Sequence, residues 1–336
     1  MTYWFFLPAA AIASLLMTGV LRRYALTRSL LDIPNERSSH SVPTPRGGGV
    51  AIVLCFLLAL PFLACFDELD WPRVWALLGA GGWVAIIGFL DDHGHIAARW
   101  RLLAHFIAAL WGLAWLGGLP PLIFFGVSVD LGWLGYVLAA LYLVWLLNLY
   151  NFMDGIDGIA SVEAISVCLG GALIYLLLDE PGLAFLPLLL AAACSGFLYW
   201  NFPPAKIFMG DAGSGFLGIT LGVLSLQAAW VAPQLLWSWL ILLGVFIVDA
   251  TWTLFRRLLR GEKVYEAHRS HAYQFASRKF GRHLPVTSAV ALLNLGWLLP
   301  IACWVAVGGV DGFFGLLLAY IPLLFLTIKF QAGKQE

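Results

Sequence analysis

Hydrophobic and polar positions alternate along this chain in long blocks, not with the short period of a surface helix or strand. A helix needs about 20 apolar residues to cross a bilayer, and runs of that length are separated by polar segments. There are eleven such runs, at 3–21, 48–66, 74–90, 102–118, 132–150, 159–178, 183–200, 214–231, 235–255, 286–307 and 311–329. The proline-containing piece at 119–129 is too short to cross and predicts an outside loop or a re-entrant turn. The pattern predicts an all-α polytopic membrane protein with about eleven transmembrane helices.

Composition supports this fold class. Hydrophobic residues make up 61% of the chain and charged residues 11%, with 16 Trp and 23 Phe. A soluble domain of this composition would have a largely apolar surface, whereas aromatic residues are enriched at membrane interfaces. A net charge of zero gives no case for nucleic acid, and five cysteines without CxxC spacing predict neither a zinc site nor disulfides. No long polar segment interrupts the runs, which favours a single membrane-embedded domain, 1–336.

The positions of the basic residues predict the orientation. If the N-terminus lies outside, every Lys and Arg except Arg73 falls on the inner side, as the positive-inside rule requires. Arg22 and Arg23 follow the first apolar run, so this run is expected to be a spanning helix and not a cleavable signal. The C-terminus is then cytoplasmic. The polar cytoplasmic segments, where an active site is expected, are 22–47, 91–101, 148–160, 201–215 and 256–285.

The sequence NLYNFMDGIDGIAS, at 148–161, joins two apolar runs. Asn148, Asn151, Asp154 and Asp157 recur every three residues, which does not place them on one face of a straight helix. Glycines at 155 and 158 predict a break that folds these polar groups into one pocket. Ionisable groups at such a position are costly unless they have a function.

Two further segments carry candidate metal ligands. Asp91 and Asp92 directly follow an apolar run, and adjacent carboxylates favour a bound cation or a raised pKa; helix capping is the alternative. The sequence NFPPAKIFMGDAGSG, at 201–215, places Lys206 for a phosphate and Asp211 for a metal before a glycine-rich helix start. Phe208, considered alone, is more often a packing residue. Oxygen ligands of this kind suit Mg²⁺, with Mn²⁺ as the alternative.

The first and last inner segments are basic. The first, DIPNERSSHSVPTPRGGG, contains Arg37, His40 and Arg46 and a triple glycine whose N–H groups are suited to approach a phosphate. An ordinary positively charged loop is the alternative, and taken alone the better one. The last contains EAHRSHAYQ, which fits binding of anionic groups better than zinc; contact with lipid headgroups is the alternative. Asp249, inside an apolar run, is interpreted as a buried polar contact between helices.

Together these motifs resemble the polyprenyl-phosphate N-acetylhexosamine-1-phosphate transferases, a glycosyltransferase family 4 of the translocase type. The resemblance covers nearly the whole chain and rests on DIPNERSSHSVPTPRGGG, the Asp91–Asp92 pair, NLYNFMDGIDG, NFPPAKIFMGDAGS, VDATWTLFRR and HRSHAYQ. It implies that undecaprenyl phosphate attacks the β-phosphorus of a UDP-N-acetylamino sugar and releases UMP. It also implies a Mg²⁺ ion that lowers the repulsion between the two phosphates. A direct attack is preferred to a covalent two-step route.

The resemblance also implies roles for individual residues. Asp211, Asp92 and Asp154 are expected to ligate the metal, with Asp211 as the first choice, and Phe208 to stack on uracil. The catalytic set is Asp91, Asp92, Asp154, Asp157 and Asp211. The substrate-binding set is Arg46, Asn148, Asn151, Asn201, Lys206, Phe208, His268, Arg269 and His271.

Two departures bear on the substrate. The chain has HRSH where the phospho-MurNAc-pentapeptide translocases have a run of histidines, and its first loop most resembles the branch that starts O-antigen synthesis. The expected donor is therefore UDP-GlcNAc, UDP-N-acetylfucosamine or UDP-N-acetylquinovosamine. A phospho-MurNAc-pentapeptide transferase is the alternative within the family, and a secondary transporter the alternative outside it. Membrane lipids are expected partners, nucleic acid is not, and a homodimer is allowed.

Overall fold

The computed structural model of the chain describes residues 2–34, 40, 42–94, 96–262 and 268–334. Arg37 lies outside these residues, as do parts of the predicted loops 22–47, 91–101 and 256–285. The helices are η1 (Thr2–Phe5), α1 (Phe6–Thr27), α2 (Val50–Cys65), α3 (Trp71–His93), α4 (Ala98–Leu116), α5 (Trp133–Phe152), α6 (Ile159–Leu177), α7 (Pro181–Asn201), α8 (Asp211–Val231), α9 (Pro233–Leu242), α10 (Gly244–Leu259), α11 (Ala272–Phe280), α12 (Leu284–Leu293), η2 (Asn294–Leu298, a π-helical turn), α13 (Leu299–Val307) and α14 (Gly312–Lys329). The predicted all-α class is confirmed.

Each of the eleven apolar runs coincides with helical structure. The run at 235–255 is divided between α9 and α10, which meet at an angle of 72°. In the described residues, eight helical segments are long and apolar enough to cross a membrane, or nine if the bent pair is one span. Of the other two runs, α2 has only 16 residues, and α4 carries Arg99, Arg101 and His105 in its first turns. A polytopic membrane protein is supported, while the count of eleven and the orientation stay predictions.

The described residues form two short antiparallel strand pairs. β1 (Leu31–Asp32) pairs with β2 (Thr44–Pro45) in the first polar loop. β3 (Leu122–Phe124) and β4 (Val127–Val129) form a hairpin between α4 and α5. The piece at 119–129 thus contains a hairpin, and its position outside the membrane stays a prediction.

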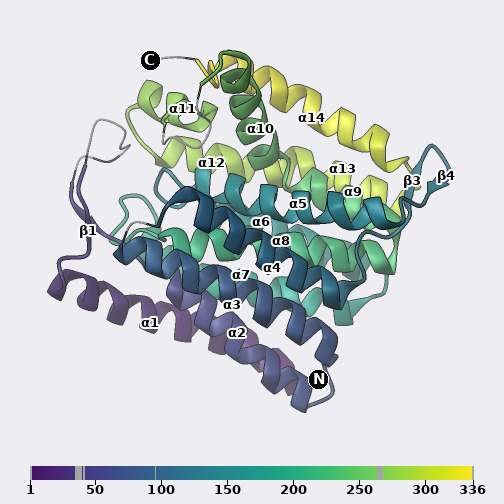
Figure 1. The fold of residues 1–336 in the computed structure, drawn as a ribbon, viewed down its shortest axis with the longest axis horizontal. Helices are drawn as coiled ribbons and strands as arrows, with labels where there is room; N and C mark the ends of the chain where they lie inside the picture. Colours follow the sequence, from purple (N-terminus) through teal and green to yellow (C-terminus); the bar gives the residue numbers. More distant parts are fainter. Residues whose placement is uncertain (1, 35–39, 41, 95, 263–267, 335–336) are drawn as a thin grey trace.

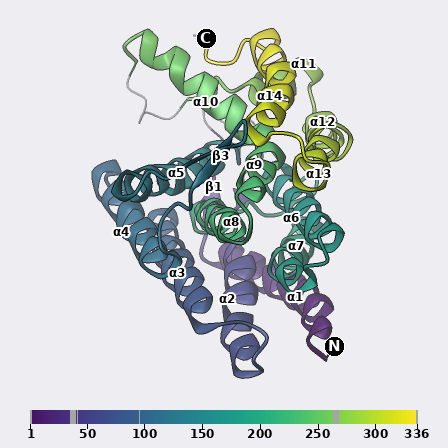
Figure 2. The same ribbon diagram turned by 90° about the vertical axis from the view of Figure 1, so that its right-hand side faces the viewer.

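Helix α8 occupies the centre of the bundle (Figure 2). It packs against α2, α3, α5 and α9, and nearly all of its side chains are buried. Its sequence, DAGSGFLGITLGVLSLQAAWV, places small residues at many positions, so neighbouring helices can approach closely. Because the other helices surround α8, its first turn lies near the middle of one end of the bundle.

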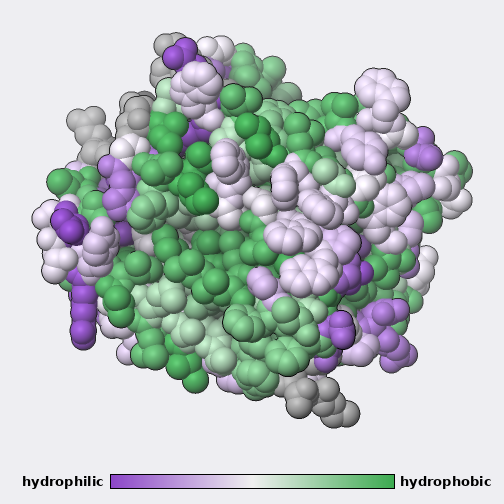
Figure 3. All heavy atoms as spheres, turned by 60° about the horizontal axis from the view of Figure 1, so that its bottom comes forward, coloured by the Kyte–Doolittle hydropathy of each residue, from purple (hydrophilic) through white to green (hydrophobic). Residues whose placement is uncertain are grey.

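The two ends of the bundle differ in what they carry. Figure 1 shows the N-terminus and the β3–β4 hairpin at one end, and β1, α11 and the C-terminus at the other; we call the latter the α11 end. Hydrophobic residues cover much of the face in Figure 3, with hydrophilic residues gathered mainly toward its sides. On α1, Leu16 and Val20 each expose 65% of their surface, as expected for side chains that face lipid. The polar motifs meet at the α11 end.

Candidate active site

Asp92, at the end of α3, holds the N-terminus of α8. One of its carboxylate oxygens accepts a hydrogen bond from the backbone N–H of Asp211 (3.2 Å), and the other from that of Ala212 (3.4 Å). The first N–H groups of a helix have no partner within the helix and need such an acceptor. Gly210 precedes them with φ +78°, and a Cβ there would lie 2.6 Å from Asp92 Oδ2. Asp92 therefore acts as a helix cap, but for α8 and not for its own helix.

Asp91 faces a different neighbour. Its Oδ1 accepts a hydrogen bond from the backbone N–H of Ile96 (2.8 Å), and its Oδ2 pairs with Arg101. The same Arg101 nitrogen lies 3.4 Å from Asp211 Oδ2, so this guanidinium bridges two carboxylates. In the sequence, Arg101 is only one of the basic residues that predict the orientation. Arg101 follows the Asp91–Asp92 pair closely in the sequence, and this short spacing was the signal that could have identified it as a partner of the carboxylates.

The predicted break between two runs is present, because α5 ends at Phe152 and α6 begins at Ile159. Asn151 Nδ2 donates to Asp211 Oδ1 and to Ser214 Oγ, each at 3.0 Å, so the break is joined to the start of α8. Asn148 lies apart from this group. Its Nδ2 donates to the carbonyl of Val144 (2.7 Å) and lies 3.4 Å from His105 Nδ1.

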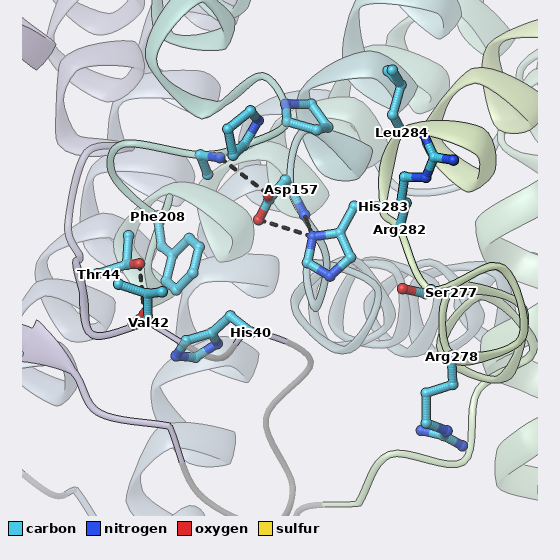
Figure 4. Close-up of a pocket in the computed structure, with 14 residues that line it drawn as sticks. His40, Val42, Thr44, Asp157, Phe208, Ser277, Arg278, Arg282, His283 and Leu284 are labelled. Carbon is cyan, nitrogen blue, oxygen red and sulfur yellow. Dashed lines mark hydrogen bonds and ion pairs between the residues drawn. The ribbon is translucent and has the colours of Figure 1, made fainter.

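Asn201 and Asp157 hold the segment 202–210 against this break. Asn201 accepts a hydrogen bond from the N–H of Gly158 and donates one to the carbonyl of Ile207, both 3.0 Å. Asp157 Oδ2 accepts from the N–H of Ala205 (3.0 Å), and its Oδ1 lies 3.1 Å from His283 Nδ1 (Figure 4). Both side chains are already engaged by the protein, so they shape the wall of the site.

The first polar loop supports the same segment from the other side. The N–H groups of Gly48 and Gly49 donate to the carbonyls of Phe208 and Met209, both at 2.9 Å. These two N–H groups are therefore not available to a phosphate, and they join the first polar loop to the segment 202–210 instead. Phe208 lies edge-on to His40, with ring centroids 4.8 Å apart. Arg46 donates to the backbone carbonyl of Asp92.

Asp249 positions the histidine loop. It lies buried on α10 and accepts hydrogen bonds from the N–H groups of Ala272 (2.9 Å) and Tyr273 (3.0 Å) at the start of α11. It is thus a polar contact between two helices, as interpreted from the sequence. The ring of buried His271 lies 4.8 Å from that of His268. Burial, together with His271 and Arg257, lowers the pKa of His268 to about 3, so this imidazole is neutral near pH 7.

Three cavities meet at these residues. The central cavity, about 300 Å³, contains the carboxylates. The lateral cavity, about 400 Å³, lies beside Asp91 and shares Arg46, Asp92 and Asp211 with the central cavity. The adjoining cavity, about 630 Å³, shares His40, Asp157, Phe208 and His283 with it (Figure 4). The wall formed by Arg46, Asp92 and Asp211 is therefore reached from two sides.

Most of the predicted site residues line the central cavity. They are Arg46, Asp92, Asn151, Asp154, Asp157, Asn201, Phe208, Asp211 and His268. Five others do not line it: Asp91, Asn148, Lys206, Arg269 and His271. Asp91 lines the lateral cavity, and the ring of His271 packs against that of His268. Lys206 is exposed and lies over the rings of Tyr199 and Trp200. Ser214, Gln274 and His283 also line the central cavity, but single polar residues in these segments gave no signal in the sequence.

Asp154 differs from the other carboxylates of the central cavity. Its carboxylate makes no hydrogen bond or ion pair with another residue that the structure describes, although its backbone N–H donates to the carbonyl of Asn151 (3.3 Å). Enclosure by the protein raises its pKa well above the ordinary value, and the carboxylates of Asp211, Asp92 and Asp157 raise it further. A cluster of acids around an unpartnered carboxylate requires a proton or a cation.

A divalent metal fits this donor set in part. Within the described ranges, no three His, Cys, Asp or Glu side chains come together as a preformed metal site. Mg²⁺, however, usually binds through one or two carboxylates together with substrate phosphates and water. Asp154 and Asp211 supply oxygen donors of that kind, so the residues fit a metal that arrives with a phosphorylated substrate.

Comparison with known proteins agrees with this chemistry. Residues 74–229 match the family described as Glycosyl transferase family 4. The chain is 31% identical to the decaprenyl-phosphate N-acetylglucosaminephosphotransferase of Mycolicibacterium smegmatis, with 79% of this chain and 72% of the relative aligned. It is 29% identical to the probable undecaprenyl-phosphate N-acetylglucosaminyl 1-phosphate transferase of Bacillus subtilis, with 77% and 73% aligned.

The similar proteins also include a pentapeptide transferase, the alternative within the family. The chain is 31% identical to the phospho-N-acetylmuramoyl-pentapeptide-transferase of a Picosynechococcus species, with 72% of this chain and 67% of the relative aligned. All three relatives carry the name of a transferase, which favours an enzyme over the transporter alternative. The chain belongs to the polyprenyl-phosphate N-acetylhexosamine-1-phosphate transferase family.

Proposed function

We propose that this protein transfers an N-acetylamino-sugar 1-phosphate from a UDP-sugar to undecaprenyl phosphate. An oxygen of the acceptor phosphate attacks the β-phosphorus of the donor and forms a new P–O bond. The bond from that phosphorus to the bridging oxygen breaks, and UMP leaves with the electron pair. The products are a lipid-linked sugar diphosphate and UMP.

The observation that carries this proposal is the wall shared by two cavities. A transfer between two phosphorylated substrates needs a common point that each substrate reaches from its own side. Arg46, Asp92 and Asp211 form such a point between the central and lateral cavities. We assign the donor to the central cavity, because the adjoining cavity extends it, and the acceptor phosphate to the lateral cavity.

The protein supplies position and charge, the two main requirements of phosphoryl transfer. Asp92 holds the start of α8, and Arg46 donates to the backbone carbonyl of Asp92. Asn151 orients Asp211 by a hydrogen bond of 3.0 Å. Phe208 offers an aromatic edge or face to the uracil ring, and neutral His268 offers a ring nitrogen to the sugar or diphosphate. A Mg²⁺ ion held by Asp154 and Asp211, when bound, would neutralise the diphosphate charge, and Mn²⁺ is the alternative. Asp92 could be a ligand only if it released the backbone N–H groups of α8.

Direct attack by the acceptor is the favoured route. A covalent intermediate would need an aspartate whose oxygen is available as a nucleophile. Asp91 and Asp92 each have both carboxylate oxygens engaged, by Arg101 and by backbone N–H groups. The acceptor phosphate is already an anion near neutral pH and needs no such help.

For the donor, we propose UDP-GlcNAc first, because two of the similar proteins are named for N-acetylglucosamine. UDP-N-acetylfucosamine and UDP-N-acetylquinovosamine are the donors suggested by the first loop. The reaction then starts an O-antigen or another surface polysaccharide at the cytoplasmic face of the inner membrane. UDP-MurNAc-pentapeptide is the competing donor, favoured by the pentapeptide-transferase relative.

The test is a donor panel with one purified preparation. The protein in lipid nanodiscs is incubated with undecaprenyl phosphate, Mg²⁺ and each of the four UDP-sugars, and lipid-linked product and UMP are measured. We expect equal amounts of both products with one amino-sugar donor and loss of activity when EDTA removes the metal. Absence of lipid product with all four donors would refute the proposal, and product only from UDP-MurNAc-pentapeptide would establish the competing function.

A further inference from the structure

Two basic side chains, neither of which lines one of the three cavities, meet at the Trp200 ring at the α11 end of the bundle. Lys206 Nζ lies 5.6 Å from the centre of the Trp200 ring, and the guanidinium of Arg22 lies 5.8 Å from the same ring. Lys206 also lies 5.4 Å from the ring of Tyr199. Distances of this size are typical of cation–π contacts. We call Arg22, Tyr199, Trp200 and Lys206 the basic–aromatic platform.

Hydrogen bonds fix this platform in place. Trp200 Nε1 donates to the carbonyl of Leu15 on α1 (2.9 Å), which ties the end of α7 to α1. Arg22 Nε donates to the backbone carbonyl of Lys206 (3.2 Å), and the N–H of Lys206 donates to the carbonyl of Trp200 (2.8 Å). The two positive charges are therefore held around one indole ring by the fold itself.

The platform lacks a negative partner in the described part of the chain. Neither Arg22 nor Lys206 forms an ion pair with a described carboxylate. Two cations held around one ring repel each other, and an anion between them removes that cost. A phosphate group can accept hydrogen bonds from both.

Its surroundings indicate that this anion is carried by a lipid. The platform lies where α1 and α7, two candidate membrane spans, approach their ends. Tyr199 exposes 63% of its surface and Phe202 48%, which is typical of aromatic side chains at the headgroup level of a membrane. A soluble anion would gain nothing from these exposed rings, whereas the acyl chains of a lipid would cover them.

We infer that the basic–aromatic platform binds the phosphate of an anionic phospholipid and thereby stabilises the segment 202–210. This segment joins the platform to the active site, because it contains both Lys206 and Phe208, which lines the central cavity. The effect on catalysis rests on the proposed function, whereas lipid binding itself does not.

Binding is tested without any activity measurement. The protein is placed in nanodiscs of phosphatidylcholine, alone or with about 30% phosphatidylglycerol, an anionic lipid that attracts surface Lys and Arg residues. Melting temperature is measured in each, and bound phosphatidylglycerol is counted by native mass spectrometry. We expect phosphatidylglycerol to raise the melting temperature by about 3–5 °C, and Arg22→Gln and Lys206→Gln to lose at least half of that rise and the tightly bound lipid.

Arg23→Gln is the matched control, since Arg23 is the next residue, is exposed and takes no part in the platform. It should keep both the rise and the bound lipid. If all three variants lose them equally, the effect is general surface charge and the inference is wrong. It is also wrong if the two platform variants bind phosphatidylglycerol as the unchanged protein does.

Activity provides the second measurement. With the donor identified by the panel above, phosphatidylglycerol should lower the KM for the UDP-sugar at least two-fold in the unchanged protein, and not in Arg22→Gln. If Arg22→Gln instead raises the KM for undecaprenyl phosphate at every phosphatidylglycerol content, the platform serves the acceptor and the inference is overturned. If no donor reacts, the binding measurements still decide the inference by themselves.

Discussion

Asp92 and Asp154 both line the central cavity, but their surroundings give them different tasks. Both oxygens of Asp92 accept hydrogen bonds from the first turn of α8, so this carboxylate is occupied by the fold. Asp154 has no such partner among the described residues and a pKa raised by enclosure and by neighbouring carboxylates. At the scale of single residues, the group most available to a metal or a substrate is therefore Asp154.

Asp154→Asn should lower kcat by about 100-fold or more, the size expected when one charged group that stabilises a transition state is removed. The melting temperature should stay equal or rise, because the substitution removes a charge that other carboxylates disfavour. Activity and melting temperature are measured together. Asp67→Asn, an exposed aspartate between α2 and α3, is the control and should change neither. A fall in both quantities would show that Asp154 has a structural role instead.

His268 predicts a pH dependence of stability. Its pKa in the folded protein is about 3, whereas an exposed histidine has a pKa near 6.5. The unfolded chain therefore binds this proton first, and stability should fall as pH drops from about 6.5 toward 3, by less than about 1.4 kcal/mol per pH unit. His268→Gln, which cannot bind a proton, should lose less melting temperature between pH 6.5 and pH 5 than the unchanged protein. Equal losses would contradict the assigned shift.

At the scale of elements, the site is assembled from ends of helices held by carboxylates on other helices. Asp92 on α3 caps α8, and Asp249 on α10 caps α11. The break between α5 and α6 is joined to α8 through Asn151 and to α7 through Asn201. The connections made by Asp92, Asp249 and Asn201 satisfy backbone N–H groups that would otherwise be unpaired inside the bundle. The connection made by Asn151 joins its side chain to two side chains of α8.

Asp249→Ala should loosen α11 without touching the carboxylate cluster. The N–H groups of Ala272 and Tyr273 lose their acceptor, which costs about 1–3 kcal/mol for a buried group. We expect a lower melting temperature and faster hydrogen exchange in 268–280. The KM for the donor should rise, because the start of α11 is no longer held and His271, which packs beside His268, becomes less fixed. Thr253→Val is the control: it removes only the hydroxyl that donates to Asp249 (3.1 Å) and should leave exchange in 268–280 nearly unchanged. Unaltered exchange in Asp249→Ala would refute this role.

At the scale of the whole molecule, the bundle brings the polar motifs to one end and leaves the β3–β4 hairpin at the other. Figure 1 shows the two termini at opposite ends, as an odd number of crossings requires. The three cavities lie at the same end as the C-terminus, and the distribution of Lys and Arg predicts that this end is cytoplasmic.

A topology experiment tests this orientation. A green fluorescent protein fused after the C-terminus should fluoresce, because it folds in the cytoplasm. An alkaline phosphatase inserted into the turn between β3 and β4, at the opposite end, should be active, because it folds outside. An active phosphatase at the C-terminus together with an inactive one in the β3–β4 turn would contradict the orientation. An active phosphatase at both positions would contradict the count of eleven spans.

The linear order of residues was enough to predict the all-α membrane fold, the positions of the apolar helices and the break at 153–158, because hydrophobic run length and glycine placement are local properties. It also predicted that Asp92, Asp154 and Asp211 line one cavity, since the motifs that contain them resemble those of a known family. It could not show that Asp92 is used to cap α8, that Arg101 bridges Asp91 and Asp211, or that Lys206 faces outward over Trp200. These facts depend on which helix ends meet in space, and that is decided by tertiary packing around α8, where each buried N–H group and charge has to find a partner.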